Sequence, residues 1–193
     1  MLERLFPGFR SKKRAYGLYG KLVAQARQPE FYTTFDVADT LDGRFDMILI
    51  HMFLLQNRLA TDGDATAKLR RQLQEAMVAD MDRSLREMGV GDMGIGREVK
   101  KMGVAWFGRL KAYAAAVESD DAQENLTEAV ARNLYKVENA AKAPDMAAYM
   151  ITAREALATC STAQIEALEF EFPHPDPRGE ASIAEQSKGT DNE

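Results

Sequence analysis

The segment from residue 41 to residue 60 constrains the fold more than any other part of the chain. Counted at about 100° per residue, Phe45 and Leu49 lie on one apolar face, while Met47 and Ile50 lie on the opposite side. A helix that is apolar on both sides has to be covered by other parts of the protein. We therefore expect residues 41–60 to form a helix that is buried nearly all round.

Helical spacing of apolar residues dominates the rest of the chain as well. No stretch alternates between apolar and polar residues for long enough to predict a strand. Pro29, the loop at 62–64 and Gly89 separate the helical segments. The predicted fold class is therefore all-α, a bundle of about six to seven helices, with α-helices over about 12–27, 41–60, 65–88, 97–118, 122–141, 145–159 and 161–168.

The domain organisation follows from length and composition. A chain of 193 residues, 46% of them hydrophobic, is long enough for one domain with a sizeable core. Three closely spaced prolines after Phe172, followed by small and polar residues, predict a disordered tail over 173–193. We expect a basic and apolar N-terminal segment over 1–11, a helical domain over 12–172, and this tail.

Positive charge is concentrated at the N-terminus. Residues 1–27 carry seven Lys and Arg against one acid, although the whole chain has a net charge of -5. Apolar residues accompany these charges, so the segment suits an anionic membrane surface or ribosomal RNA, with a frayed and solvated terminus as the alternative. The candidate contact residues are Arg4, Phe6, Arg10, Lys12, Lys13 and Arg14.

Cysteine content and hydropathy bear on the location of the protein. Cys160 is the single cysteine, which excludes an internal disulfide framework and fits a reducing compartment. The longest apolar run, 47–55, is interrupted by His51 and is far too short to span a bilayer. No signal peptide is recognisable. We expect a cytoplasmic protein that is soluble or peripherally attached to a membrane.

Three polar side chains interrupt the expected second helix at intervals of seven residues. Arg44, His51 and Arg58 form a stripe along one edge of it, and charges buried there would need partners. The expected third helix offers Asp80 and Glu87, which are also seven apart and lie on its apolar side. We expect these helices to pack antiparallel, with at least one stripe residue paired to one of the two acids. Such a network either fixes packing or lines an exposed groove for a client.

Motifs for catalysis or cofactor binding are weak throughout the chain. Residues 89–94 satisfy the G-x-G-x-x-G pattern of dinucleotide sites, but a helical pattern precedes them where a strand is needed. Glu171 and His174 have the Glu-x-x-His spacing of di-iron bundles, yet Pro173 denies them a helix. His51 is expected to be a hydrogen-bonded core residue. We predict no enzymatic activity, metal, cofactor, small-molecule substrate or DNA partner.

Four residues are candidates for contact with a partner protein. Asp82 and Arg86 lie four apart on the exposed face of the expected third helix, where they can form a surface ion pair. Trp106 belongs to an apolar stripe of the next helix whose default role is core packing, and Arg109 lies at the edge of that stripe. Arginines and aromatic residues often anchor protein interfaces, which makes this pair a candidate anchor.

The block from Phe31 to Tyr113 resembles the ubiquinol-cytochrome c chaperone family. The segments that carry the resemblance are Phe31-Tyr32, DTLDGRF at 39–45, Ile50-His51, Arg58-Leu59, Asp80-Met81-Asp82, LREMGVGD at 85–92, and Gly108-Arg109 through Ala112-Tyr113. The resemblance implies an assembly factor of the cytochrome bc1 complex, of the bacterial type. Its implied partner is newly made cytochrome b, or another subunit of that complex, at the inner membrane and near the ribosome.

Two other functional classes stay open. One is a helical adaptor with a different client, which would be distinguished by the protein that co-purifies. The other is a haem or metal protein that uses His51, which would absorb visible light or contain metal when purified.

Overall fold

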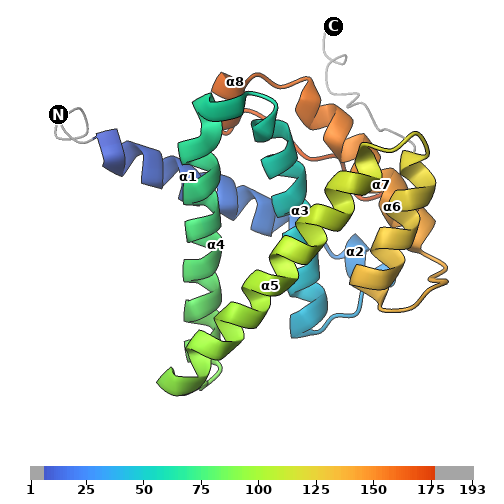
Figure 1. The fold of residues 1–193 in the computed structure, drawn as a ribbon, viewed down its shortest axis with the longest axis horizontal. Helices are drawn as coiled ribbons and strands as arrows, with labels where there is room; N and C mark the ends of the chain where they lie inside the picture. Colours follow the sequence, from blue (N-terminus) through green and yellow to red (C-terminus); the bar gives the residue numbers. More distant parts are fainter. Residues whose placement is uncertain (1–6, 177–193) are drawn as a thin grey trace, which may run out of the picture.

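The computed structural model describes residues 7–176, and every regular element in that range is helical. The predicted all-α fold class is therefore confirmed (Figure 1). In chain order the elements are α1 (Pro7–Ala26), α2 (Glu30–Thr33), α3 (Leu41–Ala60), the 3-10 turn η2 (Gly63–Thr66), α4 (Ala67–Glu87), α5 (Asp92–Val117), α6 (Ala122–Val130), the π-helical turn η3 (Ala131–Tyr135), α7 (Ala143–Ala158) and α8 (Thr162–Glu166). No helix within residues 7–176 is long and apolar enough to cross a bilayer.

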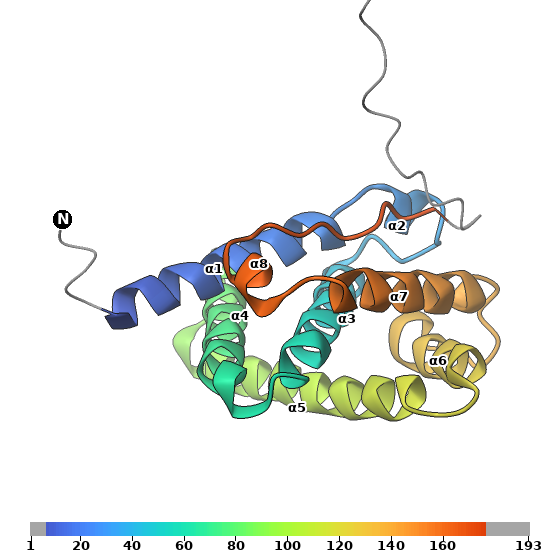
Figure 2. The same ribbon diagram turned by 90° about the horizontal axis from the view of Figure 1, so that it is seen from above.

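Helix α3 lies at the centre of the fold, as its apolar pattern predicts. Helices α1, α5 and α7 pack around it (Figures 1 and 2). Met47, Leu49 and Phe53 are among its fully buried side chains, and each buried side chain of this size contributes about 1.5–3 kcal/mol. The helix begins at a threonine cap, in which the Thr40 hydroxyl accepts a hydrogen bond of 3.1 Å from the N–H of Gly43.

Helices α4 and α5 form a V whose tip is the short loop at 88–91 (Figure 1). Gly89 turns the chain there with a φ of +82°, a value that suits glycine. Helix α5 then begins at Asp92, five residues before the expected start, so Gly94 and Gly96 lie in its first turns. Burial of Ile95 outweighs the low helix propensity of the glycines on either side of it.

Helix α4 packs mainly against α1, and this differs from the expected arrangement. It runs in the opposite sense to α3, as predicted, but its contact with α3 is minor (Figure 1). The Tyr19 hydroxyl of α1 donates a 2.9 Å hydrogen bond to Asp80, and Ser11 bonds Gln72. The apolar side of α4 is therefore directed at a helix that is distant from it in the sequence.

The segment after α6 is less helical than expected. The helix predicted over 122–141 ends at Tyr135, after the turn η3, and Lys136 follows in the left-handed region with a φ of +59°. The Tyr135 hydroxyl donates a 2.6 Å hydrogen bond to the carbonyl of Phe35, which fixes this end of the helix on the loop before α3.

Residues 167–176 run along α1 as an irregular strap (Figure 2). Phe170 and Phe172 are buried, and Lys21 of α1 donates a 3.1 Å hydrogen bond to the carbonyl of Leu168. Gln25 donates a 2.9 Å hydrogen bond to the carbonyl of Pro173. The predicted disorder is therefore wrong for 173–176, and the remainder of that segment, 177–193, lies outside the described residues.

Candidate functional site

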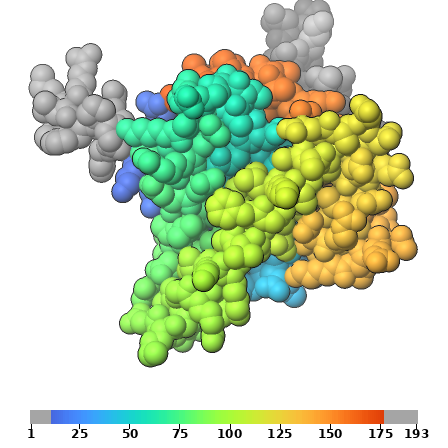
Figure 3. Space-filling model, in the orientation of Figure 1, coloured from blue at the N-terminus to red at the C-terminus, as the bar shows by residue number. Residues whose placement is uncertain are grey.

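Helix α5 carries an uncovered apolar and basic face. It crosses the front of the molecule with no other element over it (Figure 3). Met93, Val104 and Phe107 project from that face, with exposed fractions of 100%, 68% and 63%. At about 100° per residue these positions share one side of the helix with three cations and a glycine. We call this set the outer stripe: Met93, Arg97, Lys100, Val104, Phe107, Gly108 and Lys111.

The charge of the outer stripe is positive. It contains three cations and no carboxylate. Glu98, beside the stripe, lies 3.4 Å from Arg97 and 3.0 Å from Lys101. Lys100 and Lys111 have no acidic partner among the described residues. Exposed apolar groups with a polar rim are typical of protein interaction sites.

Gly108 on the outer stripe, and Gly96 and Gly103 beside it, add no side chain to this part of α5. A Cβ atom built on Gly96, Gly103 or Gly108 would meet no atom of the protein within 4 Å. Each glycine inside a helix costs about 1 kcal/mol relative to alanine. Since no neighbour within the described fold requires these glycines, the surface has room for the close approach of a second chain.

The opposite side of α5 is fixed to α3 by a buried ion pair. Arg109 Nη2 lies 2.7 Å from Asp46 Oδ1, and the Asp46 side chain is only 2% exposed. Arg109 also donates hydrogen bonds to the carbonyls of Ala105 and Asn133, at 3.3 and 3.2 Å. Breaking a buried pair of this kind costs about 3–5 kcal/mol, so the contact holds the outer stripe facing away from the core.

The environment of Asp46 makes its carboxyl a weak acid. Burial raises its pKa to about 6, and the nearby cations Arg109 and Lys136 only partly oppose that shift. Lys136 Nζ lies 3.7 Å from the second carboxylate oxygen. The Tyr113 hydroxyl is buried nearby without a hydrogen-bond partner, and burial likewise raises its pKa.

Trp106 and Arg109 are candidate partner contacts from the sequence, on a stripe whose default role is core packing, and the structure places both on the inner side of α5. The Trp106 side chain is 2% exposed, and that of Arg109 is 14% exposed and bound to Asp46. Neither side chain presents a surface to a partner in this arrangement. The sequence analysis did not single out Asp46, although an acid inside an apolar segment could have indicated a buried ion pair. It also did not single out Val104 and Phe107 on the outer side of α5.

Asp82 and Arg86 form the predicted surface ion pair. Arg86 Nε lies 2.8 Å from Asp82 Oδ2, and Arg86 Nη1 lies 2.6 Å from Asp92 Oδ1. Arg86 therefore links the end of α4 to the first turn of α5. Contact of these exposed residues with a partner stays a prediction.

The predicted pairing of the α3 stripe with α4 does not occur. Arg44 Nε lies 2.6 Å from Asp39, and Arg58 lies 2.8 Å from Asp62 and donates to the carbonyl of Cys160. These acids are four or five residues away in sequence, so local geometry satisfies both arginines. Because α4 packs on α1, Asp80 instead accepts hydrogen bonds from Tyr19 and Arg83. The exposed Glu87 makes no hydrogen bond or ion pair with the stripe within the described residues.

His51 is a hydrogen-bonded core residue, as predicted. Its Nδ1 lies 2.8 Å from the carbonyl of Met47, and its Nε2 lies 2.8 Å from the Tyr149 hydroxyl. Burial lowers its pKa to about 4, so the ring is neutral at pH 7. A neutral ring donates from Nδ1 and accepts from Tyr149 at Nε2, which leaves neither nitrogen free as a ligand.

The N-terminal candidates are only partly within the description. Arg4 and Phe6 lie outside the described residues, and Arg10 lies in α1 but its side chain is not described. Helix α1 begins at Pro7 and not near residue 12, so Lys12, Lys13 and Arg14 are exposed helical positions. Arg14 pairs with Glu166 of α8. Contact with a membrane or ribosome stays a prediction.

An all-α core that leaves an apolar and basic face of α5 uncovered is an arrangement typical of helical proteins that bind other proteins. Within the described residues, no group of histidine, cysteine and acidic side chains is arranged to hold a metal ion. The family model described as ubiquinol-cytochrome C chaperone matches residues 33–172, a range that includes all of α5. The chain belongs to this family, which confirms the resemblance seen in the sequence.

One solved structure supports the same assignment. The chain is similar to the crystal structure of the Cbp3 homolog from Brucella abortus, with 31% sequence identity and a TM-score of 0.78. The similarity covers 91% of this chain and 98% of the other. A comparison with curated proteins gave no match. Family and structural similarity together support a role as a chaperone in assembly of the cytochrome bc1 complex.

Proposed function

We propose that this protein is a non-catalytic chaperone that binds newly made cytochrome b through the outer stripe of α5. The observation that carries the proposal is the exposure of Val104 and Phe107 in the middle of a helix whose other side is firmly packed. Apolar side chains left uncovered on a rigid fold mark sites where another apolar surface binds. Cytochrome b, or another subunit of the bc1 complex, is the client that family membership favours.

The chemistry of the stripe suits an apolar segment with acidic groups nearby. Val104 and Phe107 supply the apolar contact, and covering one such side chain contributes about 1.5–3 kcal/mol. Gly108 lets the client approach the helix backbone closely. Lys100 and Lys111 lie one turn before and one turn after the apolar pair, where they meet acidic groups of the client.

Affinity capture from gently solubilised membranes tests this proposal. Tagged wild-type protein is compared with Phe107→Ser, and captured proteins are identified by mass spectrometry. Loss of about 1.5–3 kcal/mol of apolar contact corresponds to roughly tenfold or more weaker capture of cytochrome b. Val137→Ser is the matched control, because Val137 is 53% exposed but lies outside α5.

Two results would contradict the proposal. Equal recovery of cytochrome b with wild type and Phe107→Ser would show that the outer stripe is not the contact. Recovery of a different client by folded wild-type protein, with no cytochrome b, would instead support a helical adaptor of another pathway. Equal thermal midpoints of the three proteins exclude misfolding as the cause of any loss.

A further inference from the structure

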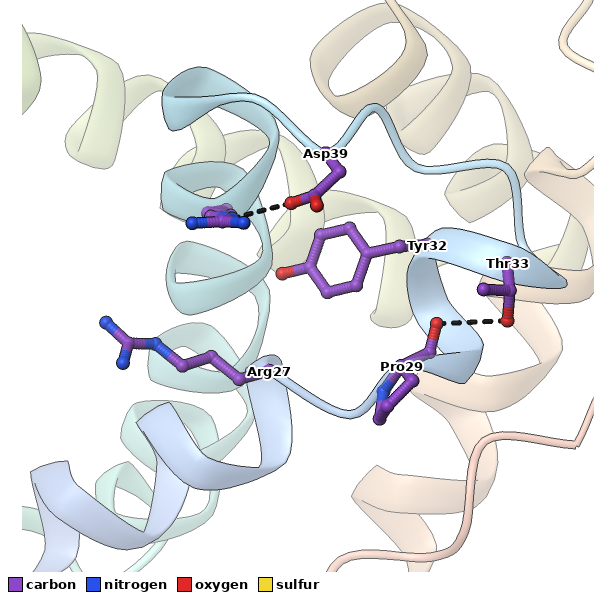
Figure 4. Close-up of a pocket in the computed structure, with 6 residues that line it drawn as sticks. Arg27, Pro29, Tyr32, Thr33 and Asp39 are labelled. Carbon is purple, nitrogen blue, oxygen red and sulfur yellow. Dashed lines mark hydrogen bonds and ion pairs between the residues drawn. The ribbon is translucent and has the colours of Figure 1, made fainter.

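A cavity of about 460 Å³ opens where the chain passes from α1 to α3. It is bounded by the residue that follows α1, by α2 and by the first turn of α3. Two arginine side chains form part of its lining. None of the lining residues belongs to the outer stripe. The lining residues are Arg27, Pro29, Tyr32, Thr33, Asp39 and Arg44 (Figure 4).

The two arginines have donors that the protein does not use. Arg44 binds Asp39 through Nε at 2.6 Å, and its two terminal amino groups have no acceptor among the described residues. The exposed Arg27 side chain makes no hydrogen bond or ion pair to a described residue. Each guanidinium therefore offers free N–H groups at the mouth of the cavity.

Tyr32 lines the cavity together with the two arginines. Its hydroxyl donates a 2.8 Å hydrogen bond to the carbonyl of Ala26, which fixes the ring as a wall of the cavity. Burial raises the pKa of this hydroxyl, and the charges of Arg44 and Arg27 both act to lower it. In Figure 4 the Tyr32 hydroxyl points toward the side of the cavity where the Arg27 guanidinium lies.

The charge balance of the cavity favours an anion. Two cations face one carboxylate, and Asp39 is already bound to Arg44. Like charges gathered in one site are unfavourable until an anion lies near them. The planar fork of arginine matches phosphate oxygens, and a tetrahedral group can accept from two guanidinium groups that approach from different directions.

We propose that this cavity binds a phosphate group between Arg27 and Arg44, with Tyr32 and Pro29 as its apolar wall. The phosphate is either inorganic phosphate or the headgroup of an anionic phospholipid. The site uses no residue of the outer stripe, so it does not depend on the binding of cytochrome b.

Calorimetric titration of the full chain with inorganic phosphate is the first test. We expect saturable binding that weakens about tenfold or more in Arg27→Gln, because one set of charge-assisted hydrogen bonds is removed. The Arg27 side chain is exposed and makes no hydrogen bond or ion pair within the described fold, so we expect this variant to keep its structure. Arg132→Gln is the control, since it removes one exposed cation outside both the cavity and the outer stripe. Acetate at the same ionic strength is expected to show no saturable binding.

Flotation with lipid vesicles distinguishes the two sources of phosphate. The site is assigned to a lipid headgroup if the protein binds vesicles that contain phosphatidylglycerol but not vesicles of phosphatidylcholine alone, and if Arg27→Gln loses that binding. Phosphate binding lost in Arg27→Gln, with vesicle binding unchanged, assigns it to the free ion. The proposal is overturned if wild-type protein binds neither probe, if Arg132→Gln weakens binding as much as Arg27→Gln, or if acetate binds as tightly as phosphate.

Discussion

Asp46 and His51 are both buried in α3, yet pH acts on their contributions to stability with opposite signs. Burial raises the pKa of Asp46 from 3.8 to about 6, so the folded state holds its proton more tightly than the unfolded state does. Its contribution is present below about pH 4 and is lost as the pH rises through 6. Burial lowers the pKa of His51 from 6.5 to about 4, so its contribution is present above pH 6.5 and is lost as the pH falls toward 4.

His51→Phe should reveal the histidine contribution. Between pH 7 and pH 4.5 the free energy of unfolding of the variant should fall less than that of wild type, by up to about 1.4 kcal/mol per pH unit. At pH 7 the variant should be less stable by about 1–3 kcal/mol, because Tyr149 and the Met47 carbonyl lose a partner. Urea unfolding at several pH values measures both effects. The same pH dependence in both proteins would contradict the pKa assigned to His51.

Arg109→Met should destabilise the protein more at pH 8 than at pH 5. At pH 8 the variant leaves the Asp46 carboxylate buried beside Lys136 alone, which costs about 3–5 kcal/mol. At pH 5 the carboxyl takes up a proton, because losing Arg109 raises its pKa further, and the cost falls. Unfolding free energies at the two pH values provide the measurement.

The double variant Asp46→Asn/Arg109→Met is the control for the buried pair. With no carboxylate to bury, its stability relative to wild type should vary less with pH than that of Arg109→Met. If Arg109→Met lost the same free energy of unfolding at pH 5 as at pH 8, packing and not charge would dominate this contact.

At the scale of elements, the turn before α3 depends on a close approach of two backbone segments. A Cβ atom on Gly43 would lie 2.0 Å from the carbonyl oxygen of Ala38, which forces the backbone to move. Gly43→Ala should therefore destabilise the protein by about 1–3 kcal/mol or more. Thermal unfolding measures the change.

Gly108→Ala is the matched control for the same substitution. No atom lies within 4 Å of a Cβ at Gly108, so alanine there should stabilise α5 by up to about 1 kcal/mol. If both substitutions had the same effect on the thermal midpoint, the close approach at Gly43 would not be a constraint on the fold.

Sequence periodicity predicted the positions of most helices because apolar spacing is a local property. Helix α3 matches its predicted range, and α4 differs from its range by two residues at the start and one at the end. The start of α5 was missed because glycines suggest a break, whereas burial of Ile95 continues the helix. The strap at 167–176 was missed in part, because its order comes from contacts with α1 that no local pattern records.

At the scale of the whole molecule, the candidate site depends on which helices are neighbours. The stripe on α3 was predicted to pair with α4, but α4 packs on α1 and the arginines pair locally. Helix α5 has apolar residues on two sides. The sequence predicted core packing as the default role of the Trp106 side, with Trp106 and Arg109 as candidate partner contacts, and it did not single out the outer side. Only the tertiary arrangement distinguishes the inner side from the outer stripe.

The attachment of the whole molecule to a membrane can be tested at its N-terminus. Removal of residues 1–6, which include four apolar side chains, should lower binding to vesicles that contain phosphatidylglycerol by about tenfold or more. Higher salt should weaken binding of the full chain, because the basic positions that follow are attracted electrostatically to anionic lipid. Cosedimentation with vesicles at two salt concentrations provides the measurement.

The truncation is compared with Arg27→Gln in the full chain, which tests the second proposed lipid contact. If the N-terminus and the cavity lined by Arg27 and Arg44 both contact lipid, each change alone should weaken vesicle binding. The two losses of binding free energy should add, because the two sites share no residue. Unchanged vesicle binding after truncation, in a protein with the same thermal midpoint, would contradict an apolar N-terminal anchor. In that case the remaining salt dependence would assign attachment to cations on the folded domain, of which the outer stripe carries three.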